Sequence, residues 1–245
     1  MRDLRIGHTE PVKVRADELL DRPVYGMSQA ARLLGLRTDG LRRWIDGYER
    51  HGKLYAPVIR ERRTLEDAVT WGEFVEAGYL REYRAKQVSL QYLRPVIGFL
   101  RERLQVKYPL ATLRPYTSGK ALALEAQDFV GLDPDLSIVV IKRDGSLTLT
   151  DPAVAFLDKV EFDDTEGIAE RLFPLGRRKP IVLDPEQSFG EPTVPDVGVR
   201  TEILAELVAA GEEPRRVAEI YSMPVEHVDQ AVEFERRHGD PVQAA

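Results

Sequence analysis

The sequence predicts an α+β protein that is mostly helical. Apolar residues recur at helical spacing near both ends of the 245-residue chain, and two β-branched runs flank an Asp-Gly pair in its middle. We therefore expect three parts. Residues 1–116 are a mainly helical first part, residues 117–183 a β-containing middle, and residues 184–245 a three-helix last part with a mobile tail.

The first part opens with two short amphipathic helices. Ser28 is a candidate N-cap, Gly35 ends the first helix, and Thr38 is the next N-cap candidate. The apolar positions are Ala30, Leu33 and Leu34 in the first helix, and Leu41, Trp44, Ile45 and Tyr48 in the second. Two short helices joined by a glycine-containing turn are typical of a helix-turn-helix.

A basic segment and two more helices follow. Residues 55–60 predict one strand of a wing. Thr70 and Ser89 are candidate caps of the two helices, and Pro95 predicts a kink or a later start in the second, because proline lacks a backbone N–H.

The middle part contains a hairpin signal. Asp144-Gly145 lies between runs 137–142 and 146–150, and an Asp-Gly pair favours a tight β-turn. Further strands are expected at residues 159–162 and 180–183, with a short helix between them that Thr165 caps and that ends near Phe173.

The last part begins with a loop at residues 184–200 that is rich in Pro, Gly and Asp. Three helices are expected after it, forming a unit similar to a helix-turn-helix. The first ends at Gly211, the second has Pro214 in its first turn, and the third begins near residues 222–224.

Charge divides the chain into unlike halves. Residues 1–118 carry 22 Lys and Arg against 15 Asp and Glu, whereas residues 119–245 carry 13 against 26. DNA is a polyanion, so the first half suits nucleic acid and the second suits a basic partner. The alternative is chance combined with simple solvation.

Polar and basic residues around the second helix and the predicted wing are the candidate DNA contacts. They are Gln29, Arg37, Thr38, Asp39, Arg42, Arg43, Arg60, Arg62 and Arg63. Arginine reads guanine edges or clamps phosphates when a recognition helix lies in the major groove. The alternative is a solvated basic face. We expect Trp44 to pack in the core and not to serve as a stacking platform.

The predicted C-terminal helices carry a net negative charge. Residues 201–237 hold four arginines against nine acids. We expect Glu226, Asp229 and Glu233, with Arg200, to contact a protein partner or to mediate dimerisation; a merely soluble surface is the alternative. The basic run 177–179 could contact DNA or the acidic C-terminal part, and the sequence leaves this open.

Composition argues against an enzyme. There is no cysteine, and the four histidines do not share metal-ligand spacing, so we expect no catalytic residue, no cofactor and no metal. The carboxylates of Asp163, Asp164 and Glu166 are interpreted as loop solvation and a helix N-terminal charge effect. No segment resembles a signal peptide or a membrane span, which predicts a cytoplasmic location.

Residues 25–104 resemble the MerR-like winged helix-turn-helix domains. The matching residues are Tyr25, Ala30, Ala31, Leu33 to Leu36, Leu41 to Trp44, and Val88 to Leu90. The order of the elements also agrees: helix-turn-helix, wing, second helical pair. The family's acidic-glycine turn after the tryptophan is replaced here by residues 45–48, and the wing is longer. The resemblance implies DNA binding.

The C-terminal part resembles a helical domain family of unknown function, numbered four-three-three. The resemblance rests on Asp184-Pro185, residues 190–194, residues 209–212 and Ile220-Tyr221. Where that family often has Gly-Thr-Arg-Ile, this chain has residues 196–199, and Arg200 follows.

The whole arrangement resembles the long VapB-type antitoxins. It implies a DNA-binding antitoxin of a type II toxin–antitoxin pair that binds a PIN-like ribonuclease toxin, binds double-stranded operator DNA as a homodimer and represses its own operon. The alternative is a stand-alone transcription regulator with a small-molecule or protein effector, and a third hypothesis is an assembly adaptor that does not bind DNA.

Overall fold

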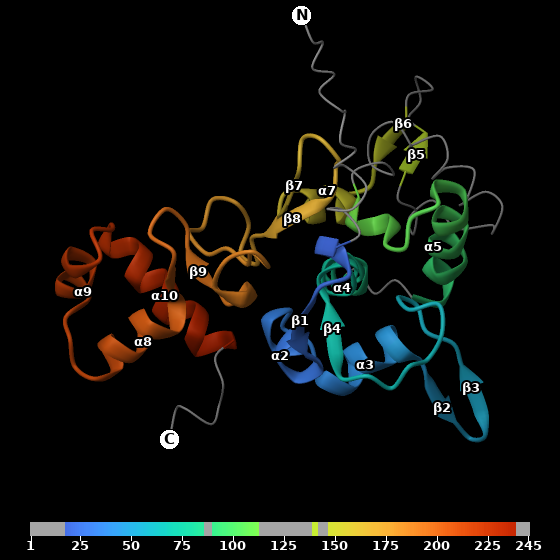
Figure 1. The fold of residues 1–245 in the computed structure, drawn as a ribbon, viewed down its shortest axis with the longest axis horizontal. Helices are drawn as coiled ribbons and strands as arrows, with labels where there is room; N and C mark the ends of the chain where they lie inside the picture. The colour runs from blue at the N-terminus through green and yellow to red at the C-terminus, as the bar shows by residue number, and fades with distance from the viewer. Residues whose placement is uncertain (1–17, 86–89, 113–138, 142–146, 239–245) are drawn as a thin grey trace, which may run out of the picture.

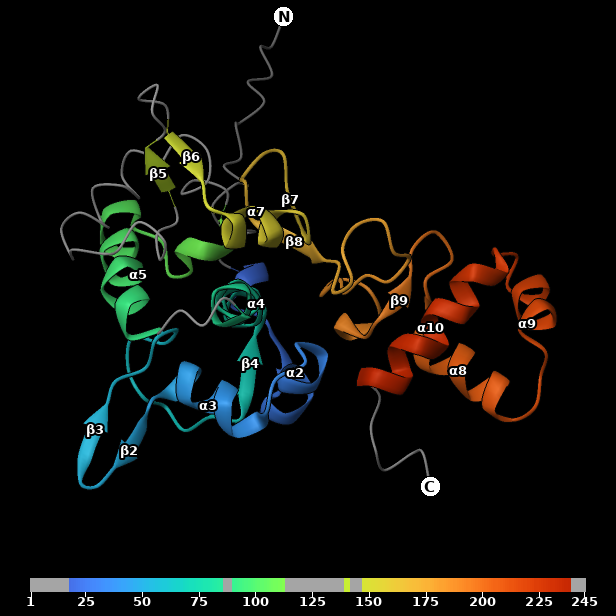
Figure 2. The same ribbon diagram turned by 180° about the vertical axis from the view of Figure 1, so that it is seen from behind.

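A computed structural model describes residues 18–85, 90–112, 139–141 and 147–238. Its larger body is built around one central helix, and a three-helix unit lies beside it, next to the first helix of the N-terminal pair (Figures 1 and 2). A two-stranded hairpin projects from the opposite side of the body. The fold is mixed α+β and mostly helical, as predicted.

The N-terminal helix pair is joined to the body by a short antiparallel sheet. Strand β1 (Pro23–Gly26) pairs with β4 (Ala68–Thr70), with Tyr25 opposite Val69. Along the chain, β1 is followed by the helices α2 (Met27–Leu33) and α3 (Thr38–Asp46), which precede β4. Both predicted caps are wrong. Gly26 and Arg37 occupy the N-cap positions, and the Asp67 carboxylate accepts from the N–H of Met27.

The projecting hairpin lies earlier in the chain than predicted. Strand β2 (Tyr48–Arg50) pairs with β3 (Lys53–Tyr55). The predicted strand at residues 55–60 is wrong. Pro57 has no N–H to pair, and Val58 and Ile59 are buried in the core, with their N–H groups donating to the Trp44 carbonyl at 2.9 and 3.0 Å.

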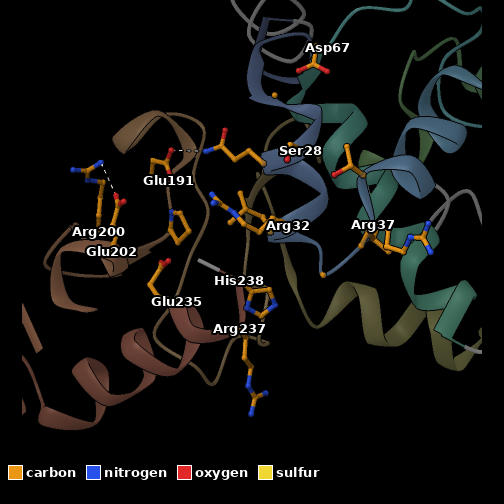
Figure 3. A pocket seen from close by; sticks show the side chains of 17 residues that line it. Ser28, Arg32, Arg37, Asp67, Glu191, Arg200, Glu202, Glu235, Arg237 and His238 are labelled. Carbon is orange, nitrogen blue, oxygen red and sulfur yellow. Dashed lines mark hydrogen bonds and ion pairs between the residues drawn. The ribbon is translucent and has the colours of Figure 1, made fainter. Parts of the chain in front are cut away.

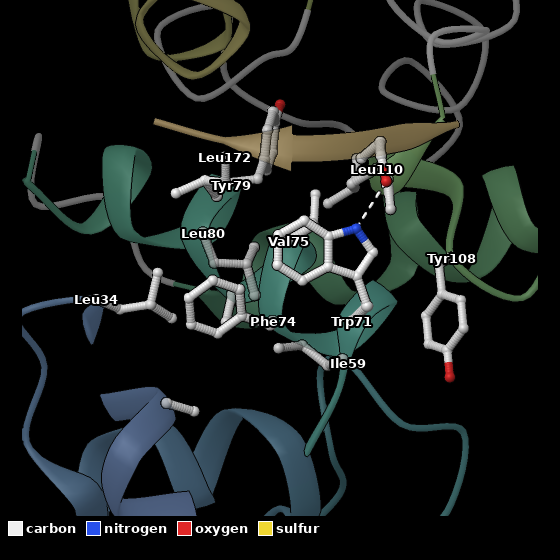
Figure 4. Packing of buried hydrophobic residues seen from close by; sticks show 14 of the residues in the cluster. Leu34, Ile59, Trp71, Phe74, Val75, Tyr79, Leu80, Tyr108, Leu110 and Leu172 are labelled. Atoms are coloured by element: carbon white, nitrogen blue, oxygen red, sulfur yellow. Dashed lines mark hydrogen bonds between the residues drawn. The ribbon is translucent and has the colours of Figure 1, made fainter. Parts of the chain in front are cut away.

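Helix α4 (Trp71–Ala85) is the centre of the core, and most of its residues are buried. Trp71 packs on Phe74 and donates its indole N–H to the Ala169 carbonyl at 2.7 Å (Figure 4). Thr70 caps this helix as predicted: its hydroxyl accepts from the N–H of Glu73, while the Glu73 carboxylate accepts from the N–H of Thr70. This reciprocal pair is a capping box.

Helix α5 (Leu90–Leu104) follows, and the 3₁₀ turn η1 (Pro109–Ala111) packs against α4 and α5. Pro95 lies inside α5, so the helix does not start after it. The predicted cap Ser89 lies outside the described residues.

The described middle residues pack on the central helix. They form β5 (Val139–Ile141), β6 (Leu147–Leu149), α7 (Asp151–Leu157), β7 (Val160–Phe162) and β8 (Ala169–Leu172). Strands β5 and β6 pair as predicted, although Asp144-Gly145 lies outside the described residues. Buried residues from α7, β7 and β8 belong to the same apolar cluster as α4, so the described middle shares the N-terminal core.

Two expectations for the middle are wrong. No helix follows Thr165: residues 163–167 form the turn between β7 and β8, in which Asp163 accepts from the N–H of Glu166, and Gly167 adopts a φ of 66°. This turn also holds the predicted carboxylate cluster, so its acids do not lie at a helix N-terminus. Residues 180–183 contribute only isolated bridges, from Val182 to Thr193 and from Leu183 to Leu172.

The three C-terminal helices agree with the prediction, whereas the predicted loop at residues 184–200 contains a 3₁₀ turn and two short paired strands. After the turn η4 (Ser188–Gly190), strands β9 (Thr193–Val194) and β10 (Val199–Arg200) pair, and then come α8 (Thr201–Ala209), α9 (Pro214–Ile220) and α10 (Val225–His238). A small apolar cluster of its own holds these helices. Phe234 of α10 belongs instead to the large core, so it ties the unit to the body. The predicted mobile tail lies outside the described residues.

Candidate nucleic-acid interface

The turn between α2 and α3 fixes the angle between the two helices. Gly35 takes a φ of 63°, its N–H donates to the Arg32 carbonyl, and the N–H of Leu36 donates to the Ala31 carbonyl. This pattern is a Schellman motif, which satisfies carbonyls at the end of a helix. Leu41 and Ile45 then bury one face of α3 completely. The opposite face of α3 is therefore directed to solvent.

Two arginines share one acid at this end of α3. Arg37 is 85% exposed and makes two hydrogen bonds to Asp39, at 3.0 and 2.9 Å. Arg43 is 57% exposed and lies 3.4 Å from the same carboxylate. The hydrogen bond from Arg37 holds the pKa of Asp39 below its usual value. Arg42 is tied instead to Asp67, at 2.7 Å.

The β2–β3 hairpin stands next to α3. His51 and Gly52 both take positive φ values, the geometry of a two-residue hairpin turn whose twist suits its strands. The rings of Tyr48 and Tyr55 stack 4.5 Å apart, and the Arg43 guanidinium lies 5.6 Å from the Tyr48 ring. This aromatic pair links the hairpin to the exposed face of α3, and it was not predicted as part of the site.

Gly47 makes the approach of the hairpin to α3 possible. It ends α3 with a φ of 71°, and a Cβ at this position would lie 2.3 Å from the Tyr55 carbonyl oxygen. Only glycine fits without a shift of the backbone.

The structure gives Arg60 a role different from the predicted one. Its side chain is 8% exposed and lies 2.8 Å from Asp46 and 2.6 Å from Glu73. These two carboxylates raise the pKa of Arg60 against the opposing effect of burial. Arg60 thereby joins the end of α3 to the start of α4, and its guanidinium is used inside the protein. We therefore no longer expect Arg60 to contact DNA.

Two other groups of candidates are placed differently. Gln29 donates to the Glu191 carboxylate at 2.8 Å, so it contacts the loop before the C-terminal unit. Arg62 and Arg63 lie exposed on the segment between β3 and β4, and Thr38 is exposed at the start of α3. Trp44 is partly buried against the core, as expected.

A cleft of about 900 Å³ lies between α2 and the C-terminal unit (Figure 3). Its walls carry charges of both signs, among them Arg32, Arg200, Glu202 and Glu235. Burial raises the pKa of Glu235, whose carboxylate accepts a hydrogen bond from the Thr201 hydroxyl. The mixed charges make the cleft a weaker candidate for a polyanion than the face of α3.

The predicted partner residues lie on the C-terminal unit. Arg200 lies 3.6 Å from Glu202. Glu226 and Asp229 are exposed on α10. Glu233 lies 2.8 Å from Arg236, and this hydrogen-bonded pair lowers the pKa of Glu233 to about 2. Glu233 is thus largely compensated within its own helix, whereas the other two acids remain exposed.

Among the described residues, no three His, Asp or Glu side chains gather in a way that could hold a metal ion. No helix in the described part of the chain is long and apolar enough to cross a membrane.

Comparison with known proteins agrees with this architecture. Residues 181–234 match the family described as a protein of unknown function, DUF433. The crystal structure of Rv2018 from Mycobacterium tuberculosis superposes with a TM-score of 0.72 at 23% identity, covering 87% of this chain and 99% of that one. The class defined here is therefore a mostly helical α+β protein with a pair of short N-terminal helices and a C-terminal three-helix unit in the stretch that matches the DUF433 model.

Two Mycobacterium tuberculosis proteins are similar over nearly the whole chain. The uncharacterized protein Rv2308 is 32% identical over 236 residues, which cover 92% of this chain and 97% of Rv2308. The putative antitoxin VapB45 is 24% identical over 226 residues, which cover 87% of this chain and 94% of VapB45. This chain belongs to the family of Rv2308.

Proposed function

We propose that this protein is a DNA-binding antitoxin of a type II toxin–antitoxin pair. In this role it neutralises a PIN-like ribonuclease by direct contact and represses its own operon as a homodimer in the cytoplasm. It is not an enzyme and uses neither cofactor nor metal. The observation that carries the DNA-binding part is the open face of α3, where Arg37 and Arg43 are exposed next to a hairpin.

The geometry of that face suits a DNA duplex. The buried face of α3 fixes the helix, so its exposed side can enter a major groove without rearrangement. The hairpin beside it carries Arg50 and Lys53, both exposed, and phosphates on the flank of the groove are the natural partners of such side chains. Because these cations and their ion pairs are exposed to solvent, exchanging a protein carboxylate for a DNA phosphate costs little free energy.

The antitoxin part is supported by the name of a relative and by charge. The similar protein VapB45 is called a putative antitoxin, and an antitoxin requires a toxin. The acidic C-terminal half complements a ribonuclease, whose RNA-binding groove is basic, and opposite charges accelerate such encounters.

Co-expression with the adjacent gene tests the proposal. The tagged protein is expected to retain the neighbouring gene product at fixed stoichiometry, with the ribonuclease activity of that product suppressed. The complex is also expected to bind the DNA upstream of its own genes with an affinity that falls steeply with salt. Recovery of the tagged protein without a partner would contradict the antitoxin function, and salt-independent DNA binding would contradict the role given to α3.

A stand-alone regulator is the second candidate, and the cleft between α2 and α10 is the observation that favours it. Its volume of about 900 Å³ would hold a small molecule beside the helix pair. A protein that binds its upstream DNA but retains no neighbouring gene product would select this function.

A further inference from the structure

The projecting β2–β3 hairpin has two unlike faces (Figure 1). Successive side chains of a strand point to opposite faces, and directly paired residues share a face. The register of the two strands places two aromatic and two basic residues on one face, which we call the aromatic–basic face: Tyr48, Arg50, Lys53 and Tyr55. The other face carries Glu49 and Leu54, and Leu54 is 65% exposed. The cations of the strands therefore lie on one face and their acid on the other.

A stack of side chains connects the aromatic–basic face to α3. The rings of Tyr48 and Tyr55 lie 4.5 Å apart and are inclined by only 5°. The Arg43 guanidinium lies 5.6 Å from the centre of the Tyr48 ring, and the Lys53 ammonium lies 5.4 Å from the centre of the Tyr55 ring. Aromatic rings attract cations that lie over their faces. The stack therefore links an exposed cation of α3 to a cation of the hairpin.

Arg43 is restrained by two different neighbours. Asp39, one helical turn earlier, lies 3.4 Å from its guanidinium, and the Tyr48 ring follows the end of the helix. The side chain is nevertheless 57% exposed. An arginine that is restrained before binding loses less conformational entropy in the complex. Its orientation also decides whether it reads a base edge or only meets a phosphate.

The foot of the hairpin is fixed to the body. Arg94 of α5 donates to the carbonyls of Ala56 and Pro57 at 2.8 and 3.0 Å. Gly47 allows the end of α3 to pack directly on the Tyr55 carbonyl. With the foot held in this way, the stacked rings set how closely the two strands approach Arg43.

Charge indicates which partner the aromatic–basic face suits. Arg50 and Lys53 are exposed and have no carboxylate partner within the described part of the chain. A DNA duplex presents base edges in its groove and phosphates along its flank. It therefore matches a restrained arginine with two further cations beside it. Glu49, on the opposite face, would be repelled by the same phosphates.

We propose that Tyr48 and Tyr55 are positioning residues for sequence recognition. Their stack orients Arg43 toward a base edge and aligns Arg50 and Lys53 with the phosphates beside it. Neither ring has to contact DNA in this role. The inference rests on the DNA-binding part of the proposed function.

The test measures the affinity of the full-length chain for two duplexes, the DNA upstream of its own gene and a random sequence of equal length. Y48L keeps an apolar side chain but removes the ring that contacts Arg43 and Tyr55. It is expected to lower the ratio of the two affinities about tenfold, with a change of less than about threefold on the random duplex. Y48F keeps the ring and loses a hydroxyl that makes no hydrogen bond within the described residues, so its ratio is expected to stay within about twofold.

Two controls come from the same hairpin. L54A removes an exposed apolar side chain from the opposite face and is expected to leave both affinities unchanged. R50A is expected to weaken binding to both duplexes by a similar factor and to lower the slope of log affinity against log salt by about one, as for a phosphate contact.

A double-mutant cycle tests whether Tyr48 acts through Arg43. R43A is expected to lower the affinity ratio by itself. In the R43A background, Y48L is expected to change the ratio by less than about twofold, because the side chain that the ring orients is absent. Independent and additive effects of the two substitutions would overturn the positioning role.

Folding is checked by thermal unfolding of each variant. Neither tyrosine belongs to the large apolar cluster, so all variants are expected to unfold near the wild-type temperature. Y55L removes the stack from the other strand and is expected to lower the ratio as Y48L does. It therefore keeps the inference testable if Y48L folds poorly.

The outcomes separate the inference from the proposed function. An unchanged ratio in Y48L and Y55L would overturn the inference and leave DNA binding standing, whereas absence of salt-dependent DNA binding by the wild type would contradict the proposed function itself. A tenfold loss in Y48F would place the hydroxyl in direct contact with DNA, and an equal loss in L54A would place the opposite face there; either would overturn the inference. Unchanged DNA affinity of R50A with loss of the neighbouring gene product would assign the face to a protein partner and overturn it as well.

Discussion

The helix pair α2–α3 and the helices α8–α10 are two small helical units with opposite surfaces. The first rests on the large core, and its open face carries Arg37 and Arg43. The second has a small cluster of its own, and acids dominate its helices. Similar local topology therefore says little about the ligand. The sign of the exposed charge distinguishes the two units.

A second contrast lies within the N-terminal region, between buried and exposed arginines. Arg60 is enclosed by two carboxylates, whereas Arg43 is solvated and lies 3.4 Å from one. Both belong to a basic stretch of sequence, but only the exposed one can exchange its partner for a phosphate. Substitutions of the two kinds of arginine should therefore have unlike effects.

Arg60→Ala is expected to lower the free energy of unfolding by about 3–5 kcal/mol. The substitution leaves Asp46 and Glu73 buried without their shared cation, at the junction of α3 and α4. Urea denaturation followed by circular dichroism measures the change. Arg62→Ala, two residues away at an exposed position, is the control and is expected to change it by less than about 0.5 kcal/mol. Similar losses in both variants would abolish the contrast.

Replacing Arg42 and Arg43 together with alanine is expected to weaken operator binding roughly 100-fold while leaving stability nearly unchanged, because each cation contributes about 1–3 kcal/mol to DNA binding. The slope of log affinity against log salt should fall by about two, one for each phosphate that the variant no longer neutralises. Fluorescence anisotropy with upstream DNA measures both quantities.

Arg215 and Arg216 provide the matched control for that experiment. They are also adjacent exposed arginines, but lie on α9 in the acidic unit. Their joint replacement is expected to change DNA affinity by less than about twofold. A loss equal to that of the α3 variant would mean that DNA binds across both units, and the division of roles by charge would be wrong.

Glu76 gives a pH-dependent test of the body on which α3 rests. Burial raises its pKa to about 7, while Arg101 opposes the shift. An acid with a raised pKa stays protonated in the fold after it has ionised in the unfolded chain. Its stabilising contribution is therefore complete below about pH 4 and is lost as the pH rises toward 7.

Between pH 5 and pH 8 the wild type is expected to lose on the order of 2 kcal/mol of stability relative to Glu76→Gln. Glutamine cannot ionise but can still accept the hydrogen bond from the N–H of Leu110. Denaturation curves of both proteins at several pH values give the difference. A constant difference across this range would show that Glu76 is already ionised in the folded protein at pH 5.

The sequence was informative where local signals and tertiary packing agree. Thr70 caps α4 as predicted, although the reciprocal bond from Glu73 was not predicted, and Pro214 lies at the start of α9 as expected. Prediction failed where a distant residue decided the outcome. The first turn of α2 is satisfied by Asp67, forty residues away, and not by the adjacent Ser28. The spacing of apolar residues along the chain gives no information about contacts between residues so far apart in sequence.

The site was harder to predict than the fold, for a similar reason. Arg60, Arg62 and Arg63 look equivalent in sequence, because the carboxylates that enclose Arg60 come from α3 and α4. From the sequence, Gln29 was expected to contact DNA. In the structure it donates a hydrogen bond to Glu191, 162 residues away. The stacked pair Tyr48 and Tyr55 was missed because the hairpin register was not recognised. Sequence patterns find a basic region; tertiary contacts decide which of its cations are available.

The smallest expected effect concerns Asp39, an acid within the arginine face. Its carboxylate is shared by Arg37 and Arg43 and restrains both side chains. Exposed ion pairs of this kind contribute little to stability, so Asp39→Asn should unfold like the wild type.

The total DNA affinity of Asp39→Asn should change by less than about threefold, because loss of a negative charge and loss of arginine orientation act in opposite directions. The ratio of operator to random-sequence affinity should fall, since misdirected arginines still bind phosphates but read bases less well. Competition binding with both DNAs measures that ratio. An unchanged ratio would mean that Asp39 does not orient the two arginines. A more than tenfold loss of affinity for both DNAs would mean that the Asp39 carboxylate itself contacts DNA.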